Sequence, residues 1–143
     1  MFLDTESINE RLAKLSQIIK LLEQYRAESE KDFLTDFTVN SATQFNLIIG
    51  LEVIVDIGSH ILNELYQVRP KEYSEVIATL GGYDVIPIEF AAEQSGMAGF
   101  RNFIIHQYED VDMKKIYQYL QNAPSIFRKF AEYYVDFLKK IDH

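Results

Sequence analysis

Cysteine is absent from all 143 residues of the sequence. Disulfides, iron–sulfur clusters and zinc sites built on thiolates are therefore excluded, and a reducing compartment is a compatible environment. The first residues have neither a basic start nor an apolar stretch, so no signal peptide is predicted. Uninterrupted apolar runs also stay below the roughly 18 to 20 residues that cross a membrane. We therefore expect a cytoplasmic protein that has no membrane among its partners.

Signs of disorder and of internal division are lacking as well. Hydrophobic residues make up 48% of the chain and charged residues 25%, which is typical of a globular protein. A chain of 143 residues is long enough to bury a core of its own. Because no linker, repeat or low-complexity segment interrupts it, residues 1–143 are predicted to form a single domain.

Basic residues are scarce, and this scarcity bears on the choice of ligand. The sequence has 14 lysines and arginines against 22 acidic residues, a net charge of -8. Such a balance argues against nonspecific nucleic-acid binding, which depends on neutralising phosphates. Residues 1–100 carry a balance of -9, whereas residues 101–143 carry +1. An anionic ligand is therefore expected at the C-terminal part, although an ordinary charge-balanced surface explains the same distribution.

Apolar residues recur at three- and four-residue steps along almost the whole chain, which is the pattern of helices packed on one side. The first helix is predicted to end near Arg26, with Ser7 and Glu10 as a capping box at its start. A short turn of helix follows over residues 32–37. A long helix over residues 41–67 is apolar on nearly every side, as expected of a helix buried against several others or at a subunit interface.

Proline and glycine are few, and they mark the predicted boundaries in the second half. Pro70 ends the long helix, because proline lacks an N–H and disfavours a helical residue before it. Pro87 and Pro124 are expected to open helices, where the missing N–H has no partner to lose. The remaining helices are predicted over residues 73–80, 88–108, 110–121 and 124–141. No strand pattern occurs, so the fold class is predicted to be all-α, an antiparallel four-helix-type bundle with short accessory helices.

One stretch departs from this apolar pattern. It reads Arg101-Asn102-Phe103-Ile104-Ile105-His106-Gln107-Tyr108, with arginine, histidine and tyrosine at the spacing R-x4-H-x-Y. A guanidinium and an imidazole are costly among such apolar neighbours unless they are solvated, paired or functional.

On an ideal helix this stretch has two faces. With Arg101 at zero, Asn102 falls near 100°, His106 near 140° and Tyr108 near -20°, at about 100° per residue. Asn102 and His106 are four residues apart, so the amide is placed to fix the imidazole tautomer. The opposite arc holds apolar residues that are expected to pack inward, namely Phe100, Phe103 and Ile104.

An arginine and a histidine without metal ligands suit the cleavage of RNA. A histidine can remove the proton of a ribose 2′-hydroxyl or protonate the departing oxygen, while an arginine holds the phosphate bidentately. The carboxylate clusters of a two-metal nuclease are missing near the motif, which points to a metal-independent ribonuclease. By itself R-x4-H-x-Y is a weak pattern, and a solvated helix face with a capping histidine also matches it.

Arg101 and His106 diverge by about 140° on an ideal helix, so one protomer alone does not aim both at one small group. A two-fold partner is expected to supply the missing half. Gly96 and Gly99 permit a second backbone to come close, although poor helix formers near a helix start explain them equally. Asp56 and His60, four apart on the long helix, are candidates to support the site, with a helix-stabilising contact as the alternative.

The chain from about residue 40 to the end resembles the HepT-like branch of the HEPN superfamily. The specific element of the resemblance is Arg101-Asn102-x3-His106-x-Tyr108. Three further segments support it, Val55-Asp56-Ile57-Gly58-Ser59-His60-Ile61, Arg69-Pro70-x-x-Tyr73 and Val111-Asp112-x-x-x-Ile116-Tyr117.

This resemblance implies an RNA-cleaving toxin of a type VII toxin–antitoxin module, which works as a homodimer with both motif helices at one cleft. It implies that Arg101 binds the scissile phosphate, that His106 serves in general acid–base catalysis, and that Asn102 orients His106. Cleavage would need no cofactor and no metal. The implied partner is an MntA-like minimal nucleotidyltransferase antitoxin, which uses ATP and Mg²⁺ to attach AMP to Tyr108 and so places negative phosphate beside the catalytic cation.

A second hypothesis belongs to a different class. A catalytically silent HEPN module would hold a nucleotidyltransferase partner or a nucleotide, with its acidic surface serving protein contacts. Intact Arg101 and His106 favour the enzyme, whereas the net charge of -8 gives little help to the capture of RNA.

Overall fold

The computed structural model describes residues 3–106 and 112–142, apart from the side chains of Ala98 and His106. Over these residues the chain is helical and contains no strand, so the predicted all-α class is confirmed. The helices are α1 (Thr5–Arg26), α2 (Glu30–Thr35), α3 (Phe37–Tyr66), α4 (Tyr73–Gly82), α5 (Ile88–Gln94), α6 (Met97–His106) and α7 (Met113–Ile141).

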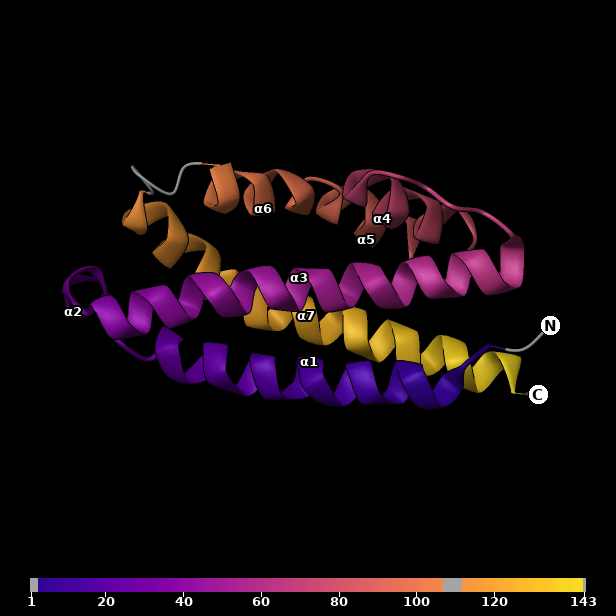
Figure 1. Ribbon diagram of the computed structural model, residues 1–143, viewed down its shortest axis with the longest axis horizontal. Helices are drawn as coiled ribbons and strands as arrows, with labels where there is room; N and C mark the ends of the chain where they lie inside the picture. Colours follow the sequence, from indigo (N-terminus) through magenta and orange to yellow (C-terminus); the bar gives the residue numbers. More distant parts are fainter. Residues whose placement is uncertain (1–2, 107–111, 143) are drawn as a thin grey trace.

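Three long helices and one composite element make the bundle. Figure 1 shows α1, α3 and α7 side by side along the long axis, with α4, α5 and α6 strung along the side of α3 that faces away from α1. The chain runs up, down, up and down through these four elements, and both ends lie at the same end of the bundle. The predicted antiparallel four-helix arrangement is therefore confirmed. Its third element along the chain consists of the short helices α4, α5 and α6.

The centre of the core lies where α3 crosses α7. Gly50 permits this close approach, because a Cβ atom at that position would lie 2.3 Å from Cε2 of Phe127. Further along, the fully buried Tyr134 donates a hydrogen bond of 2.8 Å from its hydroxyl to the backbone carbonyl of Ile54. These contacts hold α3 in a fixed position, and α3 in turn forms the floor of the site described below.

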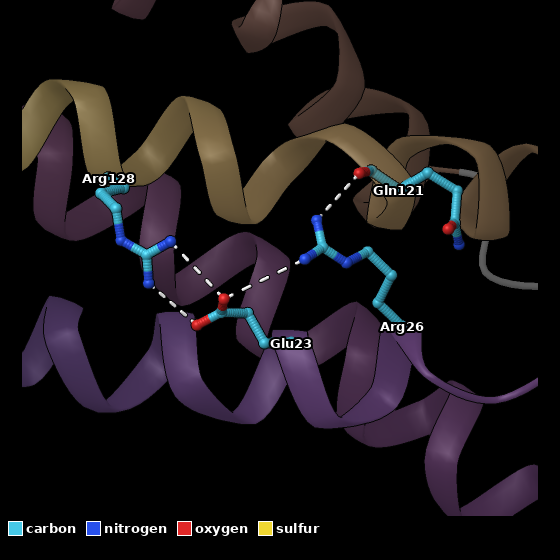
Figure 2. Close-up of polar contacts among 4 residues, drawn as sticks. All are labelled: Glu23, Arg26, Gln121 and Arg128. Carbon is cyan, nitrogen blue, oxygen red and sulfur yellow. Dashed lines mark hydrogen bonds and ion pairs between the residues drawn. The ribbon is translucent and has the colours of Figure 1, made fainter.

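Ion pairs on the outside join α1 to α7. Figure 2 shows the carboxylate of Glu23 between two arginines, with Arg128 Nη2 at 2.9 Å and Arg26 Nη2 at 4.0 Å. Arg26 also donates from Nη1 to the carbonyl oxygen of Gln121, at 3.2 Å. This cluster lies on the side of the bundle away from α6.

By length and composition alone, α3 would suffice to cross a membrane. More than half of its most apolar window is buried against the rest of the protein, as in the core helix of a soluble protein. Its apolar character on nearly every side follows from contacts with α1, α4, α6 and α7, which agrees with the sequence prediction of a helix buried against several others.

The starts of two helices were wrongly predicted. Asp4 caps α1 by accepting from the backbone N–H of Ser7 at 3.0 Å, so Ser7 lies inside the helix and forms no capping box with Glu10. The long helix α3 begins at Phe37 instead of residue 41, because Asp36 caps it by accepting from the Val39 N–H. In both cases an aspartate just upstream provides the cap.

Two boundaries in the second half were also wrong. The predicted continuous helix over residues 88–108 is broken between α5 and α6, because Ser95 and the poor helix former Gly96 form a turn there. Conversely, α7 runs through Pro124 without interruption. Its apolar face is buried on both sides of the proline, and Figure 1 shows its first turns descending more steeply than the rest, as expected of a proline bend. The predicted end near residue 108 lies outside the described residues.

Candidate functional site

Helix α6 presents the motif with the two faces that the sequence predicts. Phe100 and Ile104 are buried against the core, whereas Asn102 and Ile105 are exposed. Arg101 lies at the border between these faces and is half-buried. The predicted inward and outward arcs are confirmed for these residues.

Arg101 reaches across to α3, where its Nε lies 2.9 Å from Oε1 of Glu52. Both side chains keep close to 30% of their surface exposed, so the pair is partly solvated. The hydrogen bond to Glu52 raises the pKa of Arg101, and the guanidinium therefore stays charged at any physiological pH. This pair fixes one edge of the guanidinium and leaves recognition of an oxyanion to the terminal nitrogens.

Tyr73, the first residue of α4, completes a cluster of three. Its hydroxyl donates to the second carboxylate oxygen of Glu52, and Cζ of Arg101 lies 5.1 Å from the centre of its ring. Burial and the hydrogen bond to Glu52 raise the pKa of Tyr73 to about 12, so the hydroxyl remains a donor. Partial burial would raise the pKa of Glu52, but the hydrogen bonds from Tyr73 and Arg101 outweigh it and lower that pKa.

The other motif residues are placed only in part. Asn102 is exposed and accepts from Nη1 of Arg101 at 3.3 Å, so in this structure its amide contacts the arginine. The backbone of His106 forms the last residue of α6, while its side chain lies outside the described part of the protein. Tyr108 also lies outside the described residues. The roles expected for His106 and Tyr108, and the orientation of His106 by Asn102, stay predictions.

Asp56 and His60 have different neighbours along α3. Asp56 lies one turn beyond Glu52 with an exposed side chain. Enough protein surrounds its carboxyl to raise the pKa, and the nearby Arg11 opposes this rise only partly. His60 lies a further turn along α3, and its Nε2 is buried without a hydrogen-bond partner among the described residues. A supporting role for Asp56 and His60 stays a prediction.

Glu52 is the residue that sequence reasoning missed. It lies 49 positions from Arg101, and nothing local in the sequence joins the two. A signal was nevertheless present, because Glu52 interrupts the most apolar part of the long helix, where a charge needs a partner. The sequence gives Tyr73 no predicted role beyond its place at the end of the Arg69-Pro70-x-x-Tyr73 segment.

Comparison of the sequence with known proteins identifies its family. The family model described as Ribonuclease HepT-like matches residues 15–134. This chain belongs to the HepT-like ribonuclease family. The predicted resemblance to the HepT-like branch is therefore confirmed.

Two curated relatives share the length of the chain. The tRNA nuclease HepT of Aphanizomenon flos-aquae is 26% identical over 132 residues, which cover 90% of this chain and 90% of that protein. The mRNA nuclease HepT of Shewanella oneidensis is 22% identical over 122 residues, which cover 85% of this chain and 91% of that protein. Both are nucleases of RNA, in agreement with the predicted endoribonuclease.

Solved structures share the fold. The tri-AMPylated HEPN toxin of Shewanella oneidensis, in complex with its MNT antitoxin, has a TM-score of 0.78 at 22% identity and covers 88% of this chain and 94% of that one. The Bacillus subtilis protein YutE has a TM-score of 0.82 at 17% identity and covers 97% of this chain and 93% of that one. The predicted HEPN fold is therefore confirmed.

Proposed function

We propose that this chain is the RNA-cleaving toxin of a toxin–antitoxin module, and that Arg101 and His106 carry out the cleavage without a metal ion. The observation that carries the proposal is the charged Arg101, which Glu52 holds at one edge on the exposed side of α6. The same helix continues to His106 within two turns. The two nuclease relatives support RNA as the substrate.

The proposed reaction is an internal transfer at phosphorus. The ribose 2′-oxygen attacks the scissile phosphorus, one His106 imidazole takes the 2′ proton, and a protonated His106 gives a proton to the departing 5′-oxygen. The terminal nitrogens of Arg101 bind the phosphate oxygens as their negative charge grows. The products are a 2′,3′-cyclic phosphate and a free 5′-hydroxyl.

Glu52 is a poor candidate for the proton acceptor in this reaction. Both of its carboxylate oxygens already accept hydrogen bonds, one from Arg101 and one from Tyr73. Its lowered pKa also makes it a weak base. We assign Glu52 to the positioning of Arg101 and leave the proton transfers to His106.

The proposed enzyme is a homodimer. Arg101 and His106 diverge by about 140° on one helix, so a second copy would bring a histidine to the phosphate that the first copy binds. Phe45 on α3 keeps 63% of its surface exposed and Ile105 on α6 keeps 36%. Phe45 lies two turns before Glu52 on the same stripe of α3, so exposed apolar surface adjoins the site as expected of an interface.

The proposed partner is an MntA-like minimal nucleotidyltransferase antitoxin in the same cytoplasm. It would use ATP and Mg²⁺ to attach AMP to Tyr108, which follows His106 by two positions. The added phosphate is negative at neutral pH, so it would compete with RNA for Arg101 and block access to the cleft. The AMPylated relative in complex with its antitoxin supports this partnership.

The first experiment incubates purified protein with RNA and compares three variants. Arg101→Ala and His106→Ala are each expected to lower cleavage by at least about 100-fold. Arg128→Ala is the matched control, because it removes an arginine from an ion pair of the same 2.9 Å length on the far side of the bundle (Figure 2), and it should cleave like the wild type. Equal cleavage by all three variants would refute the assigned roles.

Failure of every version to cleave RNA would favour the silent binding module instead. The partnership is tested separately, by coexpression with an MntA-like nucleotidyltransferase followed by intact-mass measurement and peptide mapping. We expect a mass increase of one or more AMP units that maps to Tyr108 and is lost in Tyr108→Phe. An adduct mapped to any other residue would count against the acceptor assignment.

A further inference from the structure

A polar hollow of about 400 Å³ opens where α3 meets the connection over residues 67–72 that leads to α4. Its lining consists of Ser59, His60, Asn63, Arg69 and Pro70. None of these residues is acidic, and Arg69 alone is an obligate cation. The lining therefore carries one positive charge and no negative one, on a protein whose net charge is -8.

Arg69 is held in the same manner as Arg101 but keeps its charge uncompensated. Its Nε donates to Oδ1 of Asn63, and the amide is in turn oriented by donating from Nδ2 to Glu64 Oε1 at 3.3 Å. The acceptor is thus a neutral amide, whereas Arg101 has a carboxylate. Within the described part of the chain, Arg69 forms no ion pair. Over the described residues its terminal nitrogens remain free of ion pairs for an acceptor that binds through two oxygens, such as a phosphate.

Two further groups at the hollow offer hydrogen bonds. The buried Nε2 of His60 has no partner among the residues that the structure describes. Ser59, one position earlier, is half-buried and carries a hydroxyl. Unpaired buried polar atoms are uncommon in folded proteins, and each calls for an explanation such as a water or a ligand. A phosphate in the hollow has an acceptor oxygen for the Ser59 hydroxyl, and a turn of the His60 imidazole towards the hollow would bring its ring N–H to a second oxygen.

The hollow lies on the same side of α3 as the cluster around Arg101. On a helix of about 100° per residue, Ser59 and Asn63 fall within about 20° of Glu52 and lie roughly 10 and 16 Å further along the axis. The connection joins the two places directly, because Arg69 borders the hollow and Tyr73, four residues later, donates to Glu52. A single strand of RNA laid along α3 would therefore pass both.

We propose that this hollow binds a backbone phosphate of the RNA substrate, away from the scissile bond that Arg101 holds. The terminal nitrogens of Arg69 contact the phosphate oxygens, and Ser59 and His60 contribute hydrogen bonds. The exposed carboxylate of Asp56 lies between the two places along α3, so the strand contacts the protein on either side of it. This inference rests on the proposed ribonuclease function for its ligand, while its test depends on binding alone.

The test measures the binding of a labelled single-stranded RNA, of about 12 nucleotides, to the His106→Ala protein at several salt concentrations. Each phosphate contact on a single strand contributes about 0.7 to the slope of log K against log salt. Adding Arg69→Ala is expected to lower that slope by about 0.7 and to weaken binding about tenfold at low salt. Lys71→Ala removes the same charge from an exposed side chain two residues away and should leave the slope unchanged.

Equal changes of the salt slope in Arg69→Ala and Lys71→Ala would overturn the proposal, because any lost positive charge would then weaken RNA binding to the same extent. Absence of RNA binding by every version would overturn it too. A slope that falls only with Arg69→Ala, together with failure of the wild-type protein to cleave RNA, would preserve the binding site and refute the proposed function instead.

A second measurement separates binding at the hollow from a structural role of Arg69. A dinucleotide has one phosphate, which Arg101 binds, so Arg69→Ala should leave kcat/KM for a dinucleotide unchanged and lower kcat/KM for the longer RNA about tenfold. Arg69→Lys should recover part of this loss, because a point charge remains without the bidentate fork. A loss of equal size on both substrates would show that Arg69 only maintains the fold near Tyr73.

Discussion

Replacing Glu52 by glutamine tests the positioning of Arg101 directly. The substitution keeps the side-chain length and one acceptor oxygen but removes the charge from the 2.9 Å contact with Arg101 Nε. A hydrogen bond to a charged acceptor is worth about 1 kcal/mol more than a neutral one. Both side chains keep close to 30% of their surface exposed, so solvent screening keeps the energy lost in Glu52→Gln near about 1 kcal/mol and not above it. If Arg101 stabilises the transition state by about 1 kcal/mol less when it is less firmly held, kcat falls about fivefold.

The same change has an opposite effect on substrate binding. Glu52 places a negative charge beside Arg101, the cation proposed to hold the phosphate, and glutamine removes the repulsion between that charge and the phosphate. KM should therefore fall together with kcat, and kcat/KM should change by less than either constant. A merely structural role for Glu52 predicts a different result, in which the fraction of active enzyme falls and KM stays the same.

Steady-state cleavage of a fluorogenic RNA over a range of substrate concentrations gives both constants. Glu23→Gln is the matched control, because Glu23 pairs with Arg128 at the same distance on the far side of the bundle (Figure 2) and should leave both constants unchanged. An unchanged kcat in Glu52→Gln, or an increase in its KM, would refute the assigned role.

Three further predictions concern stability. Gly50→Ala should lower the free energy of unfolding by about 2 kcal/mol in urea denaturation, because its Cβ would meet the Phe127 ring, and an unchanged midpoint would contradict this packing. Tyr134→Phe should cost about 1 kcal/mol through loss of the hydrogen bond to Ile54, with identical urea midpoints as the refuting result. Tyr73 has a raised pKa of about 12 in the folded protein, so its contribution to stability is complete below about pH 10 and is lost as the pH rises towards 12. Wild type and Tyr73→Phe should therefore converge in stability across that window, and a constant difference would contradict the assignment.

The fold follows from the sequence wherever local pattern decides it. The three- and four-residue steps of apolar residues give the long helices, because each buries one face against neighbours whatever their order. Local rules failed at Pro124, where loss of one backbone hydrogen bond argued for a boundary. Leu120 and Phe127 are buried on either side of that proline, and this tertiary packing keeps α7 in one piece.

The site, too, has one part that local sequence predicts and one part that depends on tertiary packing. The position of Arg101 off the buried face of α6 depends on helical spacing within that helix and was predictable. Its partner Glu52 depends on where α6 lies against α3, which is set by the packing of α4, α5 and α6 along that helix. A lone glutamate in an apolar helix signalled that some cation would meet it, but sequence spacing alone gives no means of choosing which one.

The distribution of arginines resolves the objection that an acidic protein captures RNA poorly. Broad basic surfaces bind RNA through many weak contacts. A chain with 14 basic and 22 acidic residues has few lysines and arginines with which to form such a surface. Arg101 and Arg69 are instead each held at Nε by an acceptor on α3, so little side-chain entropy is lost when a phosphate binds. A few preorganised contacts of this kind favour an RNA whose phosphates match their spacing, while the acidic remainder repels others. On this view the negative charge contributes to substrate selection.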